Sequence, residues 1–171
     1  MKISQLDTPV LLVDEAAFLR NMQRMQDIAA SAGITYRPHA KAHKSAEIAK
    51  MQIDAGACGV CCAKLGEAEV LVSQEIKDIL ITTPVIGISK LTRLMQIANK
   101  AKISVVADNS DNVAEMAAVA QTCGVKPDVV IEVDVGQGRC GVVPGDATLD
   151  LVREVVATEW LNFKGLQGYQ G

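Results

Sequence analysis

Short apolar runs rich in β-branched residues alternate along this chain with stretches of helical length. The apolar runs predict strands at residues 9–13, 34–39, 59–62, 79–82, 103–106, 129–133 and 163–167. The stretches between them predict helices at residues 17–30, 45–54, 65–73, 88–99, 112–123 and 147–158. This alternation is typical of a parallel sheet whose strands are joined by crossover helices. In the first helix, apolar spacing predicts a buried face of Phe18, Met22, Met25 and Ile28.

Polar clusters follow the ends of the predicted strands, which favours an α/β fold of the (β/α)8 (TIM) barrel type, with its chemistry at those ends. A doubly wound open sheet is the alternative. Six β-α steps leave two barrel strands unaccounted for, and residues 170–171 directly follow a strand without a closing helix. We therefore expect one domain over residues 1–171, a barrel truncated after about six strands.

The charge balance restricts the classes of partner. Asp and Glu number 20 against 17 Lys and Arg, so the net charge of −3 provides no basic surface for nucleic acid or anionic membranes. No apolar run approaches the roughly 18 residues of a membrane span. We therefore expect a small-molecule partner and a cytoplasmic location.

The five cysteines include three in one apolar segment, Cys58, Cys61 and Cys62, which favours reduced core thiols over a disulfide framework. A zinc site at Cys58 and Cys61 is disfavoured, because no second Cys or His pair follows at a suitable spacing.

Residues 37–45 contain both histidines of the chain, together with Lys41 and Lys44. Strand alternation predicts Arg37, His39 and Lys41 on one face, with Lys41 pointing into the barrel mouth beside an imidazole. Burial and neighbouring cations favour a neutral amine, the form that Schiff-base chemistry needs. A solvated basic loop before a helix is the alternative.

A second cluster, residues 132–141, runs from a strand into a glycine-spaced turn that carries Arg139. The guanidinium offers a rigid fork of donors for an oxyanion or phenolate, whereas the glycines alone would indicate only a tight turn. The segment lacks the Gly-x-Gly-x-x-Gly spacing of a dinucleotide site.

Two further candidate residues lie at the ends of predicted strands. Lys64 is a possible rival nucleophile or a helix start, and Tyr169 either reaches a ligand or lies on the rim.

Together, five segments resemble the D-threonine aldolase, 3-hydroxy-D-aspartate aldolase and D-serine dehydratase group of the alanine racemase N-terminal domain superfamily, the fold-type III pyridoxal-phosphate enzymes. These segments are residues 7–14, 37–44, 59–64, 136–141 and 163–171. The last three are most similar to the 3-hydroxy-D-aspartate aldolase branch. The resemblance implies that Lys41 forms the Schiff base with the cofactor and that His39 is a supporting or acid/base neighbour. It also implies that Arg139 contacts the cofactor near its phenolic oxygen, and that Tyr169 lies beside cofactor or substrate.

The resemblance further implies an aldolase that cleaves D-3-hydroxy amino acids, of the D-threonine or 3-hydroxy-D-aspartate type, to glycine and an aldehyde. The cofactor would be pyridoxal 5'-phosphate. A divalent metal (Mn, Mg or Zn) is expected in the full-length family, with ligands outside this chain, and so is a homodimer. Two alternatives remain: a metal-dependent dehydratase of D-serine or D-3-hydroxyaspartate, and a non-catalytic pyridoxal-phosphate-binding protein.

Overall fold

The computed structural model describes residues 2–171, and the chain divides into two compact units, Met1–Tyr36 and Arg37–Gly171. The first unit contains a short 3-10 helix, η1 (Ile3–Gln5), and a long helix, α1 (Glu15–Ser31). The Asp14 carboxylate begins α1 by accepting a hydrogen bond from the Ala17 N–H at 2.9 Å. The helix predicted at residues 17–30 is therefore confirmed.

Two other predictions for the first unit are wrong. Residues 9–13 form no strand, and their apolar side chains are exposed, Leu11 to 99%. The predicted apolar face of α1 is not buried as a whole: Phe18 and Met22 are half-buried, and Met25 and Ile28 are 46% and 49% exposed. The periodicity identified the helix correctly, but burial depends on a packing partner, which the pattern alone does not specify.

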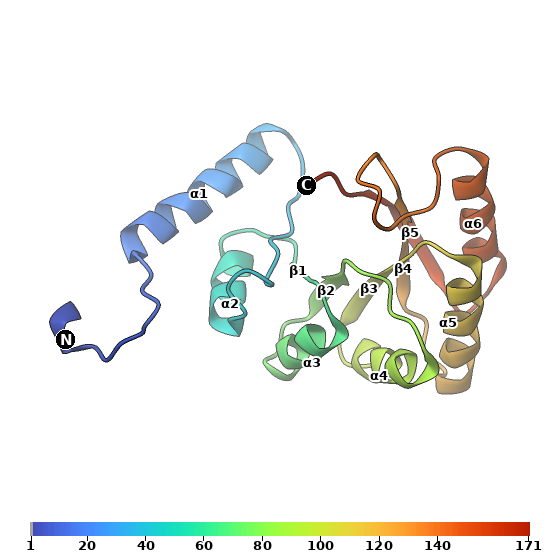
Figure 1. The fold of residues 1–171 in the computed structure, drawn as a ribbon, viewed down its shortest axis with the longest axis horizontal. Helices are drawn as coiled ribbons and strands as arrows, with labels where there is room; N and C mark the ends of the chain where they lie inside the picture. The colour runs from blue at the N-terminus through green and yellow to red at the C-terminus, as the bar shows by residue number, and fades with distance from the viewer. Residues whose placement is uncertain (1) are drawn as a thin grey trace. The chain divides into compact units, whose positions relative to one another are not determined.

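The second unit contains a five-stranded parallel sheet with the sequential order β1-β2-β3-β4-β5 (Figure 1). Its strands are β1 (Val60–Cys62), β2 (Asp78–Ile81), β3 (Lys102–Ala107), β4 (Asp128–Val133) and β5 (Asn162–Gly168). Its helices are α2 (Ala46–Asp54), α3 (Leu65–Ser73), α4 (Ile88–Ala98), α5 (Ser110–Cys123) and α6 (Asp146–Ala157). Each corresponds to a strand or helix predicted from the sequence, with ends that differ by at most a few residues.

One apolar core joins the sheet to its helices. Alternate strand residues, such as Ile79 and Ile81 on β2, are fully buried in it together with Leu91 and Met95 of α4. The sequential strand order contradicts the doubly wound alternative, in which the order reverses at a switch point. It is the order of neighbouring strands in a β/α barrel. Across residues 2–171, no helix has the length and apolar character needed to cross a bilayer.

The strand predicted at residues 34–39 is reduced to a single parallel bridge between His39 and Cys61. The Ile34 N–H is already used in ending α1, where it donates to the Ala29 carbonyl at 3.0 Å. Pro38 has no N–H, so it contributes only its carbonyl, which accepts from the Cys61 N–H at 2.7 Å. This bridge extends the β1 edge of the sheet by one position.

Candidate active site

A cavity of about 320 Å³ lies beyond the carboxyl ends of the strands. The four site residues expected from the sequence all line it: His39, Lys41, Arg139 and Tyr169. The other lining residues are Ala63, Thr82, Thr83, Gln167 and Gly168. They follow β1, follow β2, or lie at the end of β5. The cavity therefore occupies the edge at which barrel enzymes place their chemistry.

Lys41 lies in a tight turn immediately after the His39 bridge. The Ala40 N–H donates to the Cys61 carbonyl at 2.8 Å, and the Lys44 N–H closes the turn on the Ala40 carbonyl, also at 2.8 Å. Ala40 is buried and Lys41 is exposed. The sheet therefore holds one end of the turn while the Lys41 amine remains accessible in the cavity wall.

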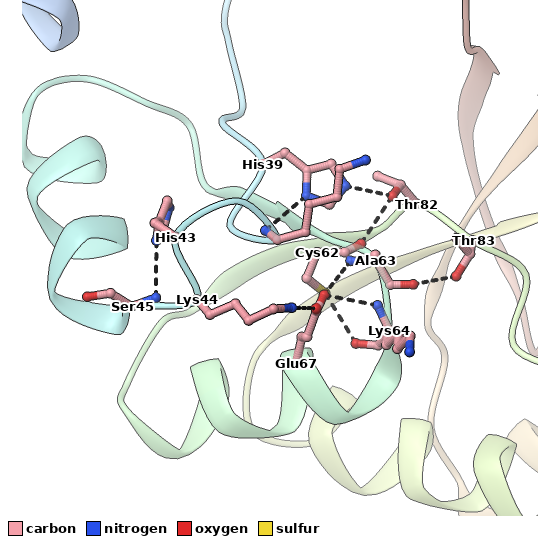
Figure 2. Close-up of polar contacts among 11 residues, drawn as sticks. His39, His43, Lys44, Ser45, Cys62, Ala63, Lys64, Glu67, Thr82 and Thr83 are labelled. Atoms are coloured by element: carbon pink, nitrogen blue, oxygen red, sulfur yellow. Dashed lines mark hydrogen bonds and ion pairs between the residues drawn. The ribbon is translucent and has the colours of Figure 1, made fainter. Parts of the chain in front are cut away.

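The His39 ring is held by hydrogen bonds at both nitrogens (Figure 2). The Thr82 hydroxyl donates to the Cys62 carbonyl at 3.1 Å, so it accepts from His39 Nε2–H, which lies 3.1 Å away. His39 Nδ1 in turn accepts the Lys41 backbone N–H at 3.3 Å. This network assigns the neutral tautomer with its proton on Nε2. Burial, together with the positive charge of Lys41, lowers the pKa of His39, in agreement with a neutral ring.

Glu67 ties the Lys41 turn to the start of α3. One carboxylate oxygen pairs with Lys44 Nζ at 2.6 Å, and the other accepts the N–H groups of Ala63 at 2.7 Å and Lys64 at 3.3 Å (Figure 2). Burial would raise the pKa of Glu67, but Lys44 and the Ala63 N–H outweigh it and lower the pKa. The carboxylate thus joins two segments that border the cavity.

Arg139 enters the cavity from a loop after β4 that is held by backbone hydrogen bonds to two carboxylates. The Asp134 carboxylate accepts the N–H groups of Gly136 at 2.9 Å and Gly138 at 3.1 Å, and Asp108 accepts the Gly141 N–H at 2.9 Å. The guanidinium carbon of Arg139 lies 4.6 Å from the centre of the Tyr169 ring, in a cation–π contact. The two residues expected to contact the cofactor are therefore neighbours.

Two residues singled out in the sequence lie outside the cavity. Arg37 pairs with Asp78 at 2.7 Å, at the first residue of β2, whereas His39 contacts Thr82, just after the end of that strand. Because Asp78 and Thr82 are four residues apart, Arg37 lies near the start of β2 and His39 near its carboxyl end, beside the cavity. Lys64 precedes α3, where Glu67 accepts its N–H. This position confirms the helix-start role and places Lys64 outside the residues that line the cavity.

The sequence did not single out Thr82, Thr83 or Gln167. The Thr83 hydroxyl donates to the Ala63 carbonyl at 2.5 Å, and the Thr82 hydroxyl donates to the Cys62 carbonyl. Both hydroxyls therefore offer lone pairs rather than protons to a ligand. The sequence feature that could have identified the two threonines is their position directly after an apolar strand, where barrel enzymes place site residues.

The buried cysteines are inert core thiols. Burial raises the pKa of Cys61 to about 11 and that of Cys62 to about 12, so both thiols stay protonated at neutral pH. Cys58 is exposed, which corrects the expectation that all three cysteines are in the core. No group of three or more potential metal-ligating His, Cys, Asp or Glu residues occurs within residues 2–171.

Comparison with known proteins gives a consistent result. The family model "Alanine racemase, N-terminal domain" matches residues 13–171. A D-threonine aldolase from Arthrobacter sp. is 44% identical over 99% of this chain and 45% of its own length. A 3-hydroxy-D-aspartate aldolase from Paracoccus denitrificans is 38% identical over 100% of this chain and 45% of its own length.

The solved structures agree with the sequence relatives. The crystal structure of D-threonine aldolase from Filomicrobium marinum matches with a TM-score of 0.97 and 41% identity, covering 99% of this chain and 46% of that one. The chain spans about half the length of the relatives that it matches. The predicted fold class, an alanine racemase-type barrel of which this chain holds part, is confirmed. The chain therefore belongs to the alanine racemase N-terminal domain family.

Proposed function

We propose that this chain carries the cofactor lysine of a pyridoxal-phosphate-dependent aldolase that cleaves D-3-hydroxy amino acids to glycine and an aldehyde. The observation that carries the proposal is the convergence of Lys41, His39, Arg139 and Tyr169 on one cavity. The order of similarity supports aldolase over dehydratase. The two aldolases are 44% and 38% identical, whereas a D-serine dehydratase from Dictyostelium discoideum is 31% identical.

The donor set of the cavity fits the reactive end of pyridoxal phosphate. Lys41 provides an accessible primary amine, the group that reacts with an aldehyde to form a Schiff base. Arg139, restrained by the Tyr169 ring, offers a planar cation to the phenolic oxygen next to that aldehyde. When bound, the cofactor supplies an electron sink for cleavage of the bond between Cα and Cβ.

The chain's own residues orient the reacting groups. His39 accepts a hydrogen bond from the Lys41 backbone N–H and donates one to the Thr82 hydroxyl, so it holds the lysine turn against the end of β2. Thr82 and Thr83 have committed their protons to backbone carbonyls and can accept hydrogen bonds from a substrate hydroxyl or ammonium. We propose His39 as a neutral neighbour that positions Lys41.

The first test is the covalent trapping of the cofactor at Lys41. The purified chain is incubated with pyridoxal phosphate, reduced with borohydride and mapped by peptide mass spectrometry. We expect one phosphopyridoxyl adduct, on Lys41, which Lys41→Ala abolishes and the matched control Lys64→Ala leaves intact. Equal labelling of many surface lysines in all three proteins would contradict the assignment.

The reaction products separate aldolase from its alternatives. With D-threonine, an aldolase releases glycine and acetaldehyde, and a dehydratase releases 2-oxobutanoate and ammonia. With 3-hydroxy-D-aspartate, the aldolase product is glyoxylate in place of acetaldehyde. Labelling of Lys41 without any of these products, with Mn²⁺, Mg²⁺ or Zn²⁺ supplied in the assay, would favour a non-catalytic pyridoxal-phosphate-binding protein over both enzymes.

A further inference from the structure

The turn of residues 40–44, which carries Lys41, borders two cavities. Lys41 lines the catalytic cavity, whereas Ala40 and Lys44 line a second cavity of about 230 Å³. The facing wall of the second cavity belongs to α3, through Gly66, Glu67, Val70 and Leu71. Apolar packing between the turn and α3 is therefore incomplete, and the position of the turn depends on its polar contacts.

The backbone of this turn ends in an unusual conformation. Lys44 has a φ of +51°, in the left-handed region that residues with a side chain rarely adopt. Such a conformation persists only where the surrounding structure holds it. The sheet holds the start of the turn, since the Ala40 N–H donates to the Cys61 carbonyl at 2.8 Å. At the far end, the side chain of Lys44 reaches across the second cavity to α3.

Glu67 is the residue of α3 that Lys44 meets. Lys44 Nζ lies 2.6 Å from one carboxylate oxygen, and the other oxygen accepts the N–H groups of Ala63 at 2.7 Å and Lys64 at 3.3 Å (Figure 2). Two backbone donors thus fix the carboxylate, so that it presents a charge in a defined place to a flexible lysine chain. Ala63 lines the catalytic cavity. The contact therefore connects the far end of the lysine turn to another part of the cavity wall.

We propose that Glu67 is a positioning residue for Lys41 and that it acts through Lys44. The ion pair holds the far end of the turn against α3, so that the Lys41 amine faces the catalytic cavity in one arrangement. The proposal rests on the proposed function for the role of Lys41 toward the cofactor. The order of the turn can be measured on the cofactor-free chain, so a failure here is distinguishable from a failure to label Lys41.

The experiment is amide hydrogen exchange of the cofactor-free chain, followed by nuclear magnetic resonance. Glu67→Gln keeps an oxygen for the Ala63 N–H but removes the charge opposite Lys44. We expect exchange of the Lys44 backbone N–H to become about threefold faster, the order of effect that an exposed ion pair can exert. The Ala40 N–H, which is bonded to the sheet, is the internal reference and should be unchanged.

The rate at which pyridoxal phosphate is trapped on Lys41 gives a second readout. Glu67→Gln and Lys44→Met should each slow this labelling about threefold, and the double variant should be no slower than either single one. Lys44→Arg keeps the cation and should label as fast as wild type. Arg93→Met breaks a comparable ion pair with Glu69 on the same helix, and as the matched control it should change neither labelling nor exchange.

Equal exchange of the Lys44 N–H in wild type and Glu67→Gln would overturn the proposal, as would equally faster exchange at Ala40, which would mean general loosening. Unchanged labelling rates in Glu67→Gln and Lys44→Met would overturn it too, because the pair would then not position Lys41. The exposed substitution Lys44→Met decides the matter if Glu67→Gln does not fold. No labelling of Lys41 in wild type would instead overturn the proposed function, and this role with it.

Discussion

The two histidines make the stability of the chain depend on pH in a defined interval. Burial lowers the pKa of both His39 and His43 from their usual value, about 6.5 in the unfolded chain. The unfolded chain therefore binds these protons more readily than the folded one, and the free energy of unfolding falls as the pH drops below about 6.5. The pKa of Glu67 is lowered instead, so its contribution is lost only at more acidic pH, below its usual value near 4.5.

Urea unfolding at pH 7.5 and 5.5 would measure this dependence. We expect lower stability at pH 5.5, and a smaller difference between the two conditions in the double variant His39→Gln, His43→Gln. The same unfolding midpoint in wild type at both values would show that the histidines titrate alike in the folded and unfolded states.

Gly141 is a residue whose backbone determines where Arg139 lies. Its φ of +111° is a conformation that side-chain-bearing residues rarely adopt, and an added Cβ would collide with the backbone of Val133 and Asp134. Gly141→Ala should destabilise the chain by more than about 1 kcal/mol and reduce trapping of pyridoxal phosphate on Lys41. Gly66→Ala, in helix α3, is the matched control: its added Cβ would meet only the Glu69 carboxylate, at 4.0 Å, and it should stabilise by up to about 1 kcal/mol. A Gly141→Ala protein as stable as wild type would show that the loop can move.

At the scale of the secondary structure elements, helix α3 depends on the Glu67 carboxylate at its first turn. Glu67→Ala leaves the N–H groups of Ala63 and Lys64 without their acceptor, and we expect a loss of about 1 kcal/mol in the free energy of unfolding. Lys44→Met removes only an exposed ion pair and should cost less than about 0.5 kcal/mol. Chemical denaturation of both variants is the measurement. A larger loss in Lys44→Met than in Glu67→Ala would mean that the ion pair, rather than the helix start, dominates.

The elements also show what the sequence could predict. The strands β1 to β5 were predicted because each is an apolar run whose alternate residues enter one core, as Ile79 and Ile81 do. Residues 9–13 have the same composition, yet they form no strand, because a strand also requires a neighbour with which to pair. Composition is a property of one segment, and pairing is a property of two.

Some residues of the candidate site could be predicted from a local motif, and others only from the folded sheet. Lys41, His39, Arg139 and Tyr169 were predicted because each belongs to a distinctive local motif, and the structure places them around one cavity. Thr82 and Gln167 belong to ordinary strand ends, so only the folded sheet reveals that they face the same cavity. Arg37 lies outside the cavity because it pairs with Asp78 at the start of β2, two residues before His39 reaches the carboxyl end.

For the whole molecule, exposed apolar surface is the property that determines its behaviour in solution. Residues 10–13 expose four consecutive apolar side chains, and the sheet of residues 37–171 ends at β5 on one side, whereas the bridge at His39 covers β1 on the other. Contiguous apolar surface and unpaired strand edges both favour association between copies. We therefore expect this chain to self-associate as its concentration rises.

Sedimentation velocity over a range of concentrations would test this expectation, with a variant to locate the surface responsible. Leu11→Ser combined with Val13→Ser removes two of the four exposed side chains and should shift the distribution toward the monomer. Val156→Ser, on α6, removes an apolar side chain that is 63% exposed but separate from that run, and should leave the distribution unchanged. If the double variant associates as strongly as wild type, the β5 edge of the sheet becomes the surface responsible. A wild-type chain that stays monomeric at every concentration would show that neither surface drives self-association, although both are exposed.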